Sequence, residues 1–261
     1  MEGRQEKLDK DSRYYISIVI PAFNEEKNIL GTLKKTESFF EGQGYSYEIL
    51  VMDDGSKDST YNIASNYART NPLIKVFKLV HRGKANTVID GIKMASGSYI
   101  LFTDADSATP IYEVKKLLHY ITDQGFDISI GSREGVGAVR KNEPWLRHFM
   151  GRVFNTIIQF LLVSDIEDTQ CGFKLFTRDV ASNIIKRMKL YTIAEEISVP
   201  KVTAFDVEML FIARKLGYKI KPVPVEWNYG ENSKVNNVRD SWNNLLEVLK
   251  VWWNNRKGLY D

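Results

Sequence analysis

Two aspartates, one residue apart, directly follow an apolar run and are the residues of this chain best suited to chemistry. The run from Ser98 to Thr103 has the composition of a buried strand, and Asp104 and Asp106 come next. Because strand side chains alternate between faces, both carboxylates share one face if strand geometry continues through them. Adjacent carboxylates repel each other unless a cation lies between them, and Mg²⁺ or Mn²⁺ bridged to phosphate oxygens is the usual solution. The alternative is that the pair caps the helix predicted after Pro110.

Other charged side chains follow other predicted strands in the same way. Each of four stands just after an apolar run: Asp53, Asp54, Lys84 and Arg133. Ligands of open α/β sheets bind at the carboxyl ends of the strands, so these positions favour one shared site. Lys84 also stands where a helix begins, which suits a phosphate. Taken alone, Asp53 and Asp54 also fit an ordinary turn, and Lys84 fits a solvated lysine.

Residues 14–133 alternate between the two periodicities of strand and helix. Strands are predicted at 15–20, 47–52, 74–80, 98–103 and 127–130, with a helix in each interval. The first helix is expected to begin at Asn24, a residue type that caps helices. Such alternation predicts an α/β fold with a mostly parallel twisted sheet and helices on both faces.

The second half of the chain is less regular. A loop is predicted over 134–144, and a long helix over 145–163 carries a polar stripe of Arg152, Asn155 and Gln159. This stripe predicts a core helix with its polar face in solvent; a helix lying on lipid is the alternative. Further elements are a strand after residue 172, helices near 178–188 and 205–216, an edge strand with two prolines over 218–227, and a helix over 240–254.

Composition limits the classes of function. The 261 residues include 36 basic and 33 acidic side chains, a balance that gives no support to nucleic-acid binding. The one cysteine, Cys171, cannot form an intrachain disulfide and is expected to be buried. Residues 1–13 have the polar character of a flexible tail, and no run reaches the roughly 18 apolar residues of a membrane span. These features predict a cytoplasmic protein, with the cytoplasmic face of a membrane as a further option.

The motifs, read in order, resemble family 2 glycosyltransferases, and within them the dolichyl-phosphate β-glucosyltransferases. The resemblance covers about 16–254 and rests on these segments: Ile-Pro-Ala-Phe-Asn-Glu-Glu (20–26), Asp-Asp-Gly-Ser-Lys-Asp-Ser-Thr (53–60), Arg-Gly-Lys (82–84), Asp-Ala-Asp-Ser-Ala-Thr (104–109), Gly-Ser-Arg (131–133), Asp-Thr-Gln-Cys-Gly-Phe-Lys-Leu-Phe (168–176), Ala-Phe-Asp-Val-Glu (204–208) and Gly-Glu-Asn-Ser-Lys (230–234). It implies a glycosyltransferase A-type, Rossmann-like fold and a nucleotide-sugar donor, with UDP-glucose the best guess. The family usually has Gly-Lys-Gly where this chain has Gly83-Lys84-Ala85.

The resemblance also implies a donor site. Pro21, Phe23 and Glu25 are expected to line the base and ribose, Asp53 or Asp54 to accept from a base N–H or a ribose hydroxyl, and Lys84 to meet a phosphate. Asp106 is the closer ligand of Mg²⁺ or Mn²⁺, and Asp104 contacts the metal or the ribose. His81 has no motif partner and is predicted to be structural.

The acceptor site is expected in the second half. An acceptor lipid phosphate is already ionised at neutral pH, so positioning and charge compensation suffice. Arg133 is the first candidate for this role, followed by Lys234 and Arg147. If the acceptor is a sugar hydroxyl, a carboxylate base is needed, and the candidates are Asp168, Asp206 and Glu208. Asp168 and Gln170 fit equally well as holders of sugar hydroxyls.

The predicted activity is therefore an inverting, metal-dependent transfer of a hexose, best glucose, to a polyprenyl or dolichyl phosphate. Alternatives are mannose transfer from GDP-mannose, transfer to a sugar hydroxyl, a nucleotide-sugar-binding scaffold without turnover, and a nucleotidyltransferase. The predicted organisation is one catalytic domain over 14–239, with a nucleotide-sugar half (14–133) and an acceptor half (134–239). An amphipathic helix and tail (240–261) follow; packing of this helix against the sheet is expected, and peripheral membrane contact is the alternative.

Overall fold

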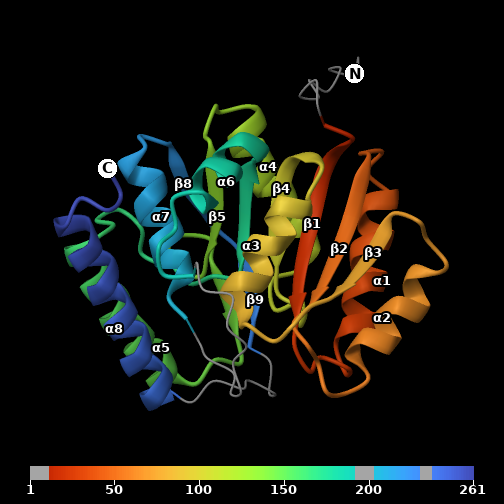
Figure 1. The fold of residues 1–261 in the computed structure, drawn as a ribbon, viewed down its shortest axis with the longest axis horizontal. Helices are drawn as coiled ribbons and strands as arrows, with labels where there is room; N and C mark the ends of the chain where they lie inside the picture. The colour runs from red at the N-terminus through yellow and green to blue at the C-terminus, as the bar shows by residue number, and fades with distance from the viewer. Residues whose placement is uncertain (1–11, 192–202, 230–236) are drawn as a thin grey trace.

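A seven-stranded sheet forms the centre of the computed structural model, which describes residues 12–191, 203–229 and 237–261, except for the side chains of 146–147 and 237–241. The strand order is β3-β2-β1-β4-β7-β5-β8. The strands are β1 (Tyr14–Ala22), β2 (Tyr47–Asp53), β3 (Ile74–Lys78), β4 (Gly97–Thr103), β5 (Ile128–Ser132), β7 (Phe173–Thr177) and β8 (Ile220–Pro224). Figure 1 shows the sheet in the middle of the molecule with helices around it.

Six of the seven strands run parallel to one another, and β7 is antiparallel to both of its neighbours, β4 and β5. The predicted mostly parallel sheet is therefore confirmed. The proline-containing β8 lies at one edge, as predicted, because proline cannot donate to a second neighbouring strand. The predicted acceptor half contributes β7 and β8, so both halves of the chain share one sheet.

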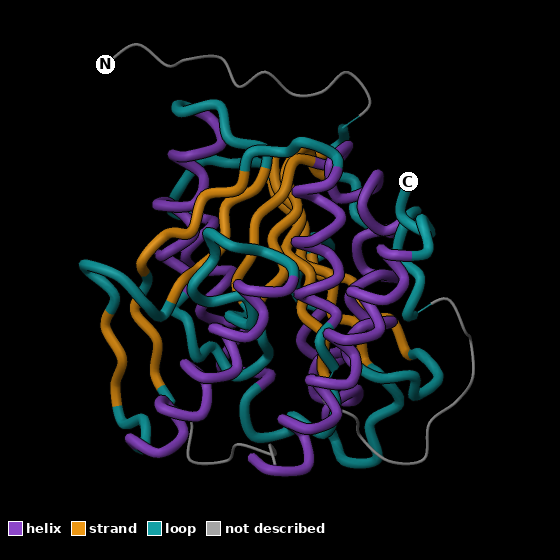
Figure 2. Tube along the Cα trace, turned by 90° about the vertical axis from the view of Figure 1, so that its left-hand side faces the viewer, coloured by secondary structure: helices purple, strands orange, loops and turns teal. Residues whose placement is uncertain are grey.

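Helices cover both faces of the sheet (Figure 2). One apolar cluster joins Ile18 and Ile20 of β1 to α1 (Ile29–Glu41), α2 (Thr60–Ala68) and α4 (Val114–Thr122). The other joins Val19, from the opposite face of the same strand, to α3 (Lys84–Met94), α6 (Arg178–Ile185) and α7 (Phe205–Lys215), and extends to α5 (Trp145–Leu161) and α8 (Asn237–Arg256). Because successive side chains of β1 point to opposite faces of the sheet, this strand contributes to two separate hydrophobic layers.

Two predicted details of the local structure were wrong. The first helix begins at Ile29 after Asn28, while Asn24 has a left-handed φ of 54° and its side chain accepts a hydrogen bond from Lys57 N. The predicted loop over 134–144 contains β6 (Val139–Lys141), which pairs with β9 (Glu226–Asn228). A short 3-10 turn, η1 (Ile111–Glu113), also precedes α4.

Asn155 and Gln159 of the polar stripe of α5 face the protein, which corrects the prediction of a solvated polar face for these two residues, whereas Arg152 is exposed. Asn155 is buried and accepts hydrogen bonds from Thr169, and Gln159 Nε2 donates to the Ile166 carbonyl at 3.1 Å. These contacts fix the rotation of the helix, so its apolar side points outward.

Candidate active site

A pocket lies at the carboxyl ends of β1, β2 and β4, the lower edge of the sheet in Figure 1. Seven of its ten lining residues come from the predicted donor and metal set: Pro21, Phe23, Glu25, Asp54, Lys84, Asp104 and Asp106; the others are Ala22, Thr87 and Ala105. The parallel strands end at the same edge, so residues far apart in sequence converge there.

Asp104 and Asp106 leave the strand and enter a turn. β4 ends at Thr103, and the turn includes Ser107 with a φ of 54°, so the shared face expected from strand geometry does not apply. Both side chains nevertheless line the pocket. Thr32 of α1 donates to the Ala105 carbonyl at 2.6 Å, and Ala108 N donates to Asp106 Oδ1 at 2.9 Å. These bonds hold the turn that presents the two carboxylates.

Lys84 is the first residue of α3 and reaches across the pocket to Asp104, with 2.5 Å between Nζ and Oδ1. The side chain is 41% exposed, yet desolvation of the ammonium group opposes its charged form; the carboxylates of Asp104 and Asp206 outweigh this and raise the pKa of Lys84. The ammonium group therefore remains charged in the pocket. It lies against the acidic pair, with its helix N-terminus beside it.

The loop after β1 and the loop after β2 are tied together by hydrogen bonds. Asn24 N donates to Ser56 Oγ at 2.9 Å, and Glu25 N donates to Thr60 Oγ1 at 2.7 Å. Asp58 Oδ1 accepts from Thr60 N, the first residue of α2, at 2.9 Å. The interlocked loops fix the wall of the pocket that carries Phe23 and Glu25.

Asp54 organises a third loop, the one before α3. Its Oδ1 accepts from Arg82 N at 2.8 Å, and its Oδ2 accepts from Gly83 N at 2.9 Å and contacts His81 Nδ1 at 2.8 Å. The His81 ring stacks on Phe23 with 4.1 Å between ring centroids and 8° between planes. His81 therefore has the predicted structural role and supports the aromatic wall of the pocket. The sequence around His81 did not indicate which residue it would support.

Asp53 is fully buried, and burial raises its pKa. Its Oδ2 accepts from Ser56 N at 3.2 Å, whereas its Oδ1 has no hydrogen-bond partner among the described residues. A buried acceptor without a partner is costly unless a ligand supplies a donor. Of the two adjacent aspartates, Asp53 has the unpaired oxygen but lies beneath the pocket wall, whereas Asp54, which lines the pocket, is engaged by backbone and His81.

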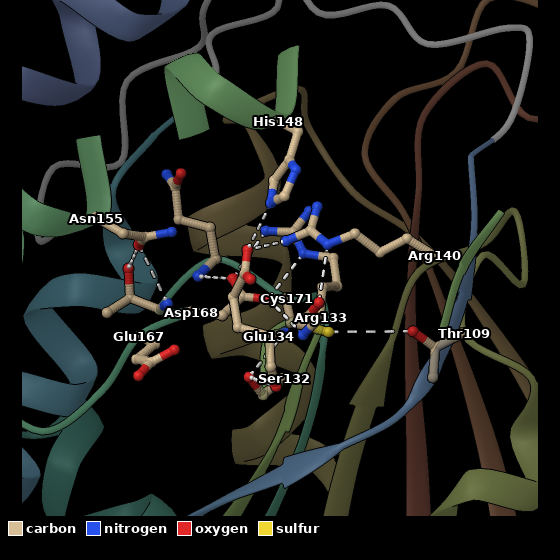
Figure 3. A network of polar contacts seen from close by, with 12 residues as sticks. Thr109, Ser132, Arg133, Glu134, Arg140, His148, Asn155, Glu167, Asp168 and Cys171 are labelled. Atoms are coloured by element: carbon tan, nitrogen blue, oxygen red, sulfur yellow. Dashed lines mark hydrogen bonds and ion pairs between the residues drawn. The ribbon is translucent and has the colours of Figure 1, made fainter. Parts of the chain in front are cut away.

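Arg133 and Asp168 form a buried, two-pronged ion pair (Figure 3). Asp168 Oδ2 accepts from Arg133 N and Nε, and Oδ1 accepts from Arg133 Nη2, all at 2.8 Å. Although burial works against the carboxylate, Arg133 lowers the pKa of Asp168 to about 2. Asp168 is thus a poor proton acceptor, which corrects its assignment as a base: it orients Arg133.

A second layer of charges surrounds this pair (Figure 3). Arg140 donates from Nε to the Arg133 carbonyl at 2.8 Å and pairs with Glu134 and Glu143, while His148 Nε2 lies 3.2 Å from Glu134. The Arg133 guanidinium also stacks over Trp227 of β9, 5.2 Å from the ring centroid. These contacts set the direction of Arg133 from several elements at once.

Asp206 and Glu208 open α7 and point to different surroundings, because residues two apart on a helix do not share a face. Asp206 pairs with the fully buried Lys174 at 2.5 Å, near enough to the pocket to raise the Lys84 pKa. Glu208 is buried among Lys189 N, Leu190 N and the Tyr260 hydroxyl. Its carboxylate is committed to the protein interior, so its assignment to the acceptor is corrected.

Three other predicted acceptor residues have different outcomes. Gln170 follows Asp168 and donates its backbone N–H to it at 3.3 Å, so it lies beside the Arg133 pair. Arg147 belongs to α5, but its side chain is outside the described set, and Lys234 lies outside the described residues. Cys171 is buried as predicted, and burial raises its pKa to about 11.

The acidic pair suits a divalent cation whose other ligands are supplied by water and by the substrate. No three His, Cys, Asp or Glu side chains within the described residues gather into a complete metal site. Mg²⁺ and Mn²⁺ sites in phosphate-transferring proteins need only one or two carboxylates, because water and phosphate oxygens complete the shell. Although the residue is exposed overall, desolvation of its carboxyl and the charge of Asp104 raise the pKa of Asp106, and a cation would relieve that repulsion.

Comparison with known proteins settles the family. A model of glycosyl transferase family 2 matches residues 17–185. The chain belongs to glycosyl transferase family 2. The predicted resemblance and the predicted class of enzyme are thereby confirmed.

Relatives of this family 2 glycosyltransferase include dolichyl-phosphate β-glucosyltransferases. That of Dictyostelium discoideum is 33% identical over 250 residues, covering 91% of this chain and 73% of the relative. That of Homo sapiens is 33% identical over 234 residues, covering 84% and 69%. Among solved structures, glucosyl-3-phosphoglycerate synthase from Mycobacterium tuberculosis, in complex with Mn²⁺, UDP and glucosyl-3-phosphoglycerate, has a TM-score of 0.63 at 19% identity, covering 92% of this chain and 81% of that one. The last likeness supports the fold.

Proposed function

We propose that this family 2 glycosyltransferase moves glucose from UDP-glucose to a polyprenyl or dolichyl phosphate, with inversion at the anomeric carbon. The observation that carries the proposal is the convergence of Phe23, Lys84, Asp104 and Asp106 on one pocket at the strand ends. The substrates are suggested by the names of the relatives, which are dolichyl-phosphate β-glucosyltransferases.

The donor half of the pocket matches the parts of a nucleotide diphosphate sugar. Phe23, backed by His81, offers an aromatic face for the base, and Asp54 at the pocket wall or the unpaired Oδ1 of Asp53 beneath it would accept from a base N–H or a ribose hydroxyl. Lys84 and the N-terminus of α3 suit the diphosphate. Asp104 and Asp106 would hold Mg²⁺ or Mn²⁺, which stabilises negative charge on a departing diphosphate when bound.

The acceptor half supplies one cation whose orientation is already fixed, the Arg133 guanidinium. Asp168 fixes the Arg133 guanidinium, and a phosphate can be held by a guanidinium through paired hydrogen bonds. An ionised phosphate oxygen attacks without a general base, so the low pKa of Asp168 does not impair this reaction. Gln170, whose backbone N–H donates to Asp168, is our candidate for contacts to sugar hydroxyls. A water-soluble donor and a lipid acceptor locate the reaction at a membrane surface, and we assign it to the cytoplasmic face.

The test is product analysis by mass spectrometry after incubation with UDP-glucose, GDP-mannose, a polyprenyl phosphate and Mn²⁺. We expect a hexosyl phosphoryl lipid from UDP-glucose, and a loss of about 100-fold or more in Asp106→Asn. Asp123→Asn, an exposed carboxylate at the end of α4, is the matched control. If product forms from GDP-mannose and not from UDP-glucose, the proposed donor is wrong. Thermal stabilisation by the donor without any product would indicate a binding scaffold.

A further inference from the structure

The neighbouring helices α5 and α8 each expose a row of apolar side chains. On α5 the exposed fractions are 78% for Trp145, 61% for Phe149, 47% for Val153 and 89% for Phe160. The corresponding residues of α8 are Trp242, Leu246, Leu249 and Trp253, which are 42–62% exposed. The spacing of three, four or seven residues places each set on one side of its helix. The two helices contact each other along one flank of the molecule (Figures 1 and 2).

The orientation of this surface is fixed by polar contacts on its inner side. Asn155 accepts from Thr169, and Gln159 donates to the Ile166 carbonyl. Arg152, at the edge of this side, is 45% exposed and pairs with Glu134 and Glu167. On α8, Glu247 is buried and accepts from Ala204 N and Tyr191. Rotation of either helix to hide its aromatic residues would leave these buried polar groups without partners, which is costly. The apolar side of each helix therefore faces outward.

Exposed charges on the two helices have one sign. Among the described side chains of α5 and α8, the charged residues that are exposed are Arg152, Lys250 and Arg256. Lys257 follows directly, with its Nζ 5.4 Å from the ring centroid of Trp253. Aromatic residues beside cationic ones suit a lipid headgroup region. A second copy of the same face would bring like charges together.

The surface also begins next to the acceptor side of the site. Trp145 opens α5, and His148, one turn on, contacts Glu134, which follows Arg133 in sequence. No helix within 12–191, 203–229 or 237–261 has the length and apolar character of a membrane span.

We propose that α5 and α8 form a membrane-docking face that lies on an anionic lipid bilayer, with their aromatic residues among the headgroups. The argument from the position of Arg133 depends on the proposed function, whereas the arguments from exposure, inner contacts and charge do not. Docking in this orientation brings the acceptor side of the pocket to the lipid surface.

The test is flotation of the full chain with vesicles of phosphatidylcholine alone or of equal parts phosphatidylcholine and phosphatidylglycerol. We expect binding to the anionic vesicles, weakened by salt, and about tenfold weaker binding in the double variant Phe149→Ser, Trp253→Ser. The control is Met94→Ser, an exposed apolar residue of α3 that should bind as the parent chain does. Equal binding by the double variant and the parent chain would overturn the proposal.

Two further measurements separate docking from folding, self-association and catalysis. The double variant should keep its thermal midpoint and its rate with a short water-soluble polyprenyl phosphate, since it changes exposed side chains outside the pocket. Asp106→Asn should lose transfer yet still float with anionic vesicles, so failure of the proposed function leaves the docking result readable. A dimer by light scattering that the double variant abolishes would show that a second copy covers the face, and would overturn the proposal.

Discussion

Gly172 lies directly against the carboxylate of Asp104. A methyl group at position 172 would overlap Asp104 Oδ1, Oδ2 and Cγ. The obstructing atoms are the end of a side chain and not backbone, so the fold can accommodate the methyl group but the carboxylate must move. The Asp104 carboxylate can therefore occupy its position only because residue 172, in the segment 168–176, has no side chain.

Gly172→Ala is accordingly expected to reduce glycosyl transfer by about tenfold or more while the thermal midpoint changes little, because displacement of a catalytic group by about 1 Å is expensive. The measurement is kcat/KM with UDP-glucose, together with a thermal melt. Gly151→Ala is the control, since a methyl group at that position of α5 would meet no described residue beyond its own helical turns within 4 Å. Full activity in Gly172→Ala would show that Asp104 is free to relocate without consequence.

Asp168→Asn should destabilise the protein, because it leaves the buried Arg133 guanidinium without its counter-charge. We expect a loss of about 3–5 kcal/mol in the free energy of unfolding at neutral pH, measured by urea denaturation. Asp165→Asn, which removes an exposed partner of Arg214, should change stability little.

The same pair predicts a dependence on pH. The folded-state pKa of Asp168, about 2, lies below its ordinary value of about 3.9. A lowered acid pKa contributes stability that is complete above the ordinary value and is lost as the pH falls through the folded value. The stability difference between the parent chain and Asp168→Asn should therefore shrink from about pH 4 to about pH 2. A constant difference across that window would contradict the assigned pairing.

Lys84→Met should tighten Mn²⁺ binding to the donor-free protein by about fivefold or more, because it removes a cation that lies 2.5 Å from Asp104. The same change should weaken UDP binding, since a phosphate partner is lost. Electron paramagnetic resonance measures the first effect and calorimetry the second. Lys57→Met, in the loop before α2, is the control. Unchanged Mn²⁺ affinity would indicate that Lys84 and the metal do not compete.

Phe23→Ala should weaken UDP binding by about tenfold, in line with the 1–3 kcal/mol of a base stacked on an aromatic ring. His81→Ala should produce a smaller loss, because His81 supports Phe23 from behind. Phe126→Ala, which alters an aromatic contact at the amino end of β5, serves as the control. The UDP affinity of each variant is measured by calorimetric titration. Equal affinities for all three variants would show that Phe23 does not stack on the base.

Sequence alone determined the elements whose signals are local. Apolar runs with strand and helix periods placed β1 to β5, and the rule that parallel strands end at one edge brought Lys84, Asp104 and Asp106 together without knowledge of the tertiary structure, while Phe23 was expected there from the family resemblance. These inferences succeed because each depends on a short stretch of chain and on the direction of its strand.

Tertiary structure decided which charged groups face one another. Asp168 is 35 residues from Arg133, and whether it acts as a base or holds a guanidinium depends on a pairing that no spacing encodes. The insertion of β7 between β4 and β5 creates that neighbourhood. The outward apolar side of α5 was undetermined for the same reason: a helical period defines two faces, and only the partners of Asn155 and Gln159 determine which one is buried.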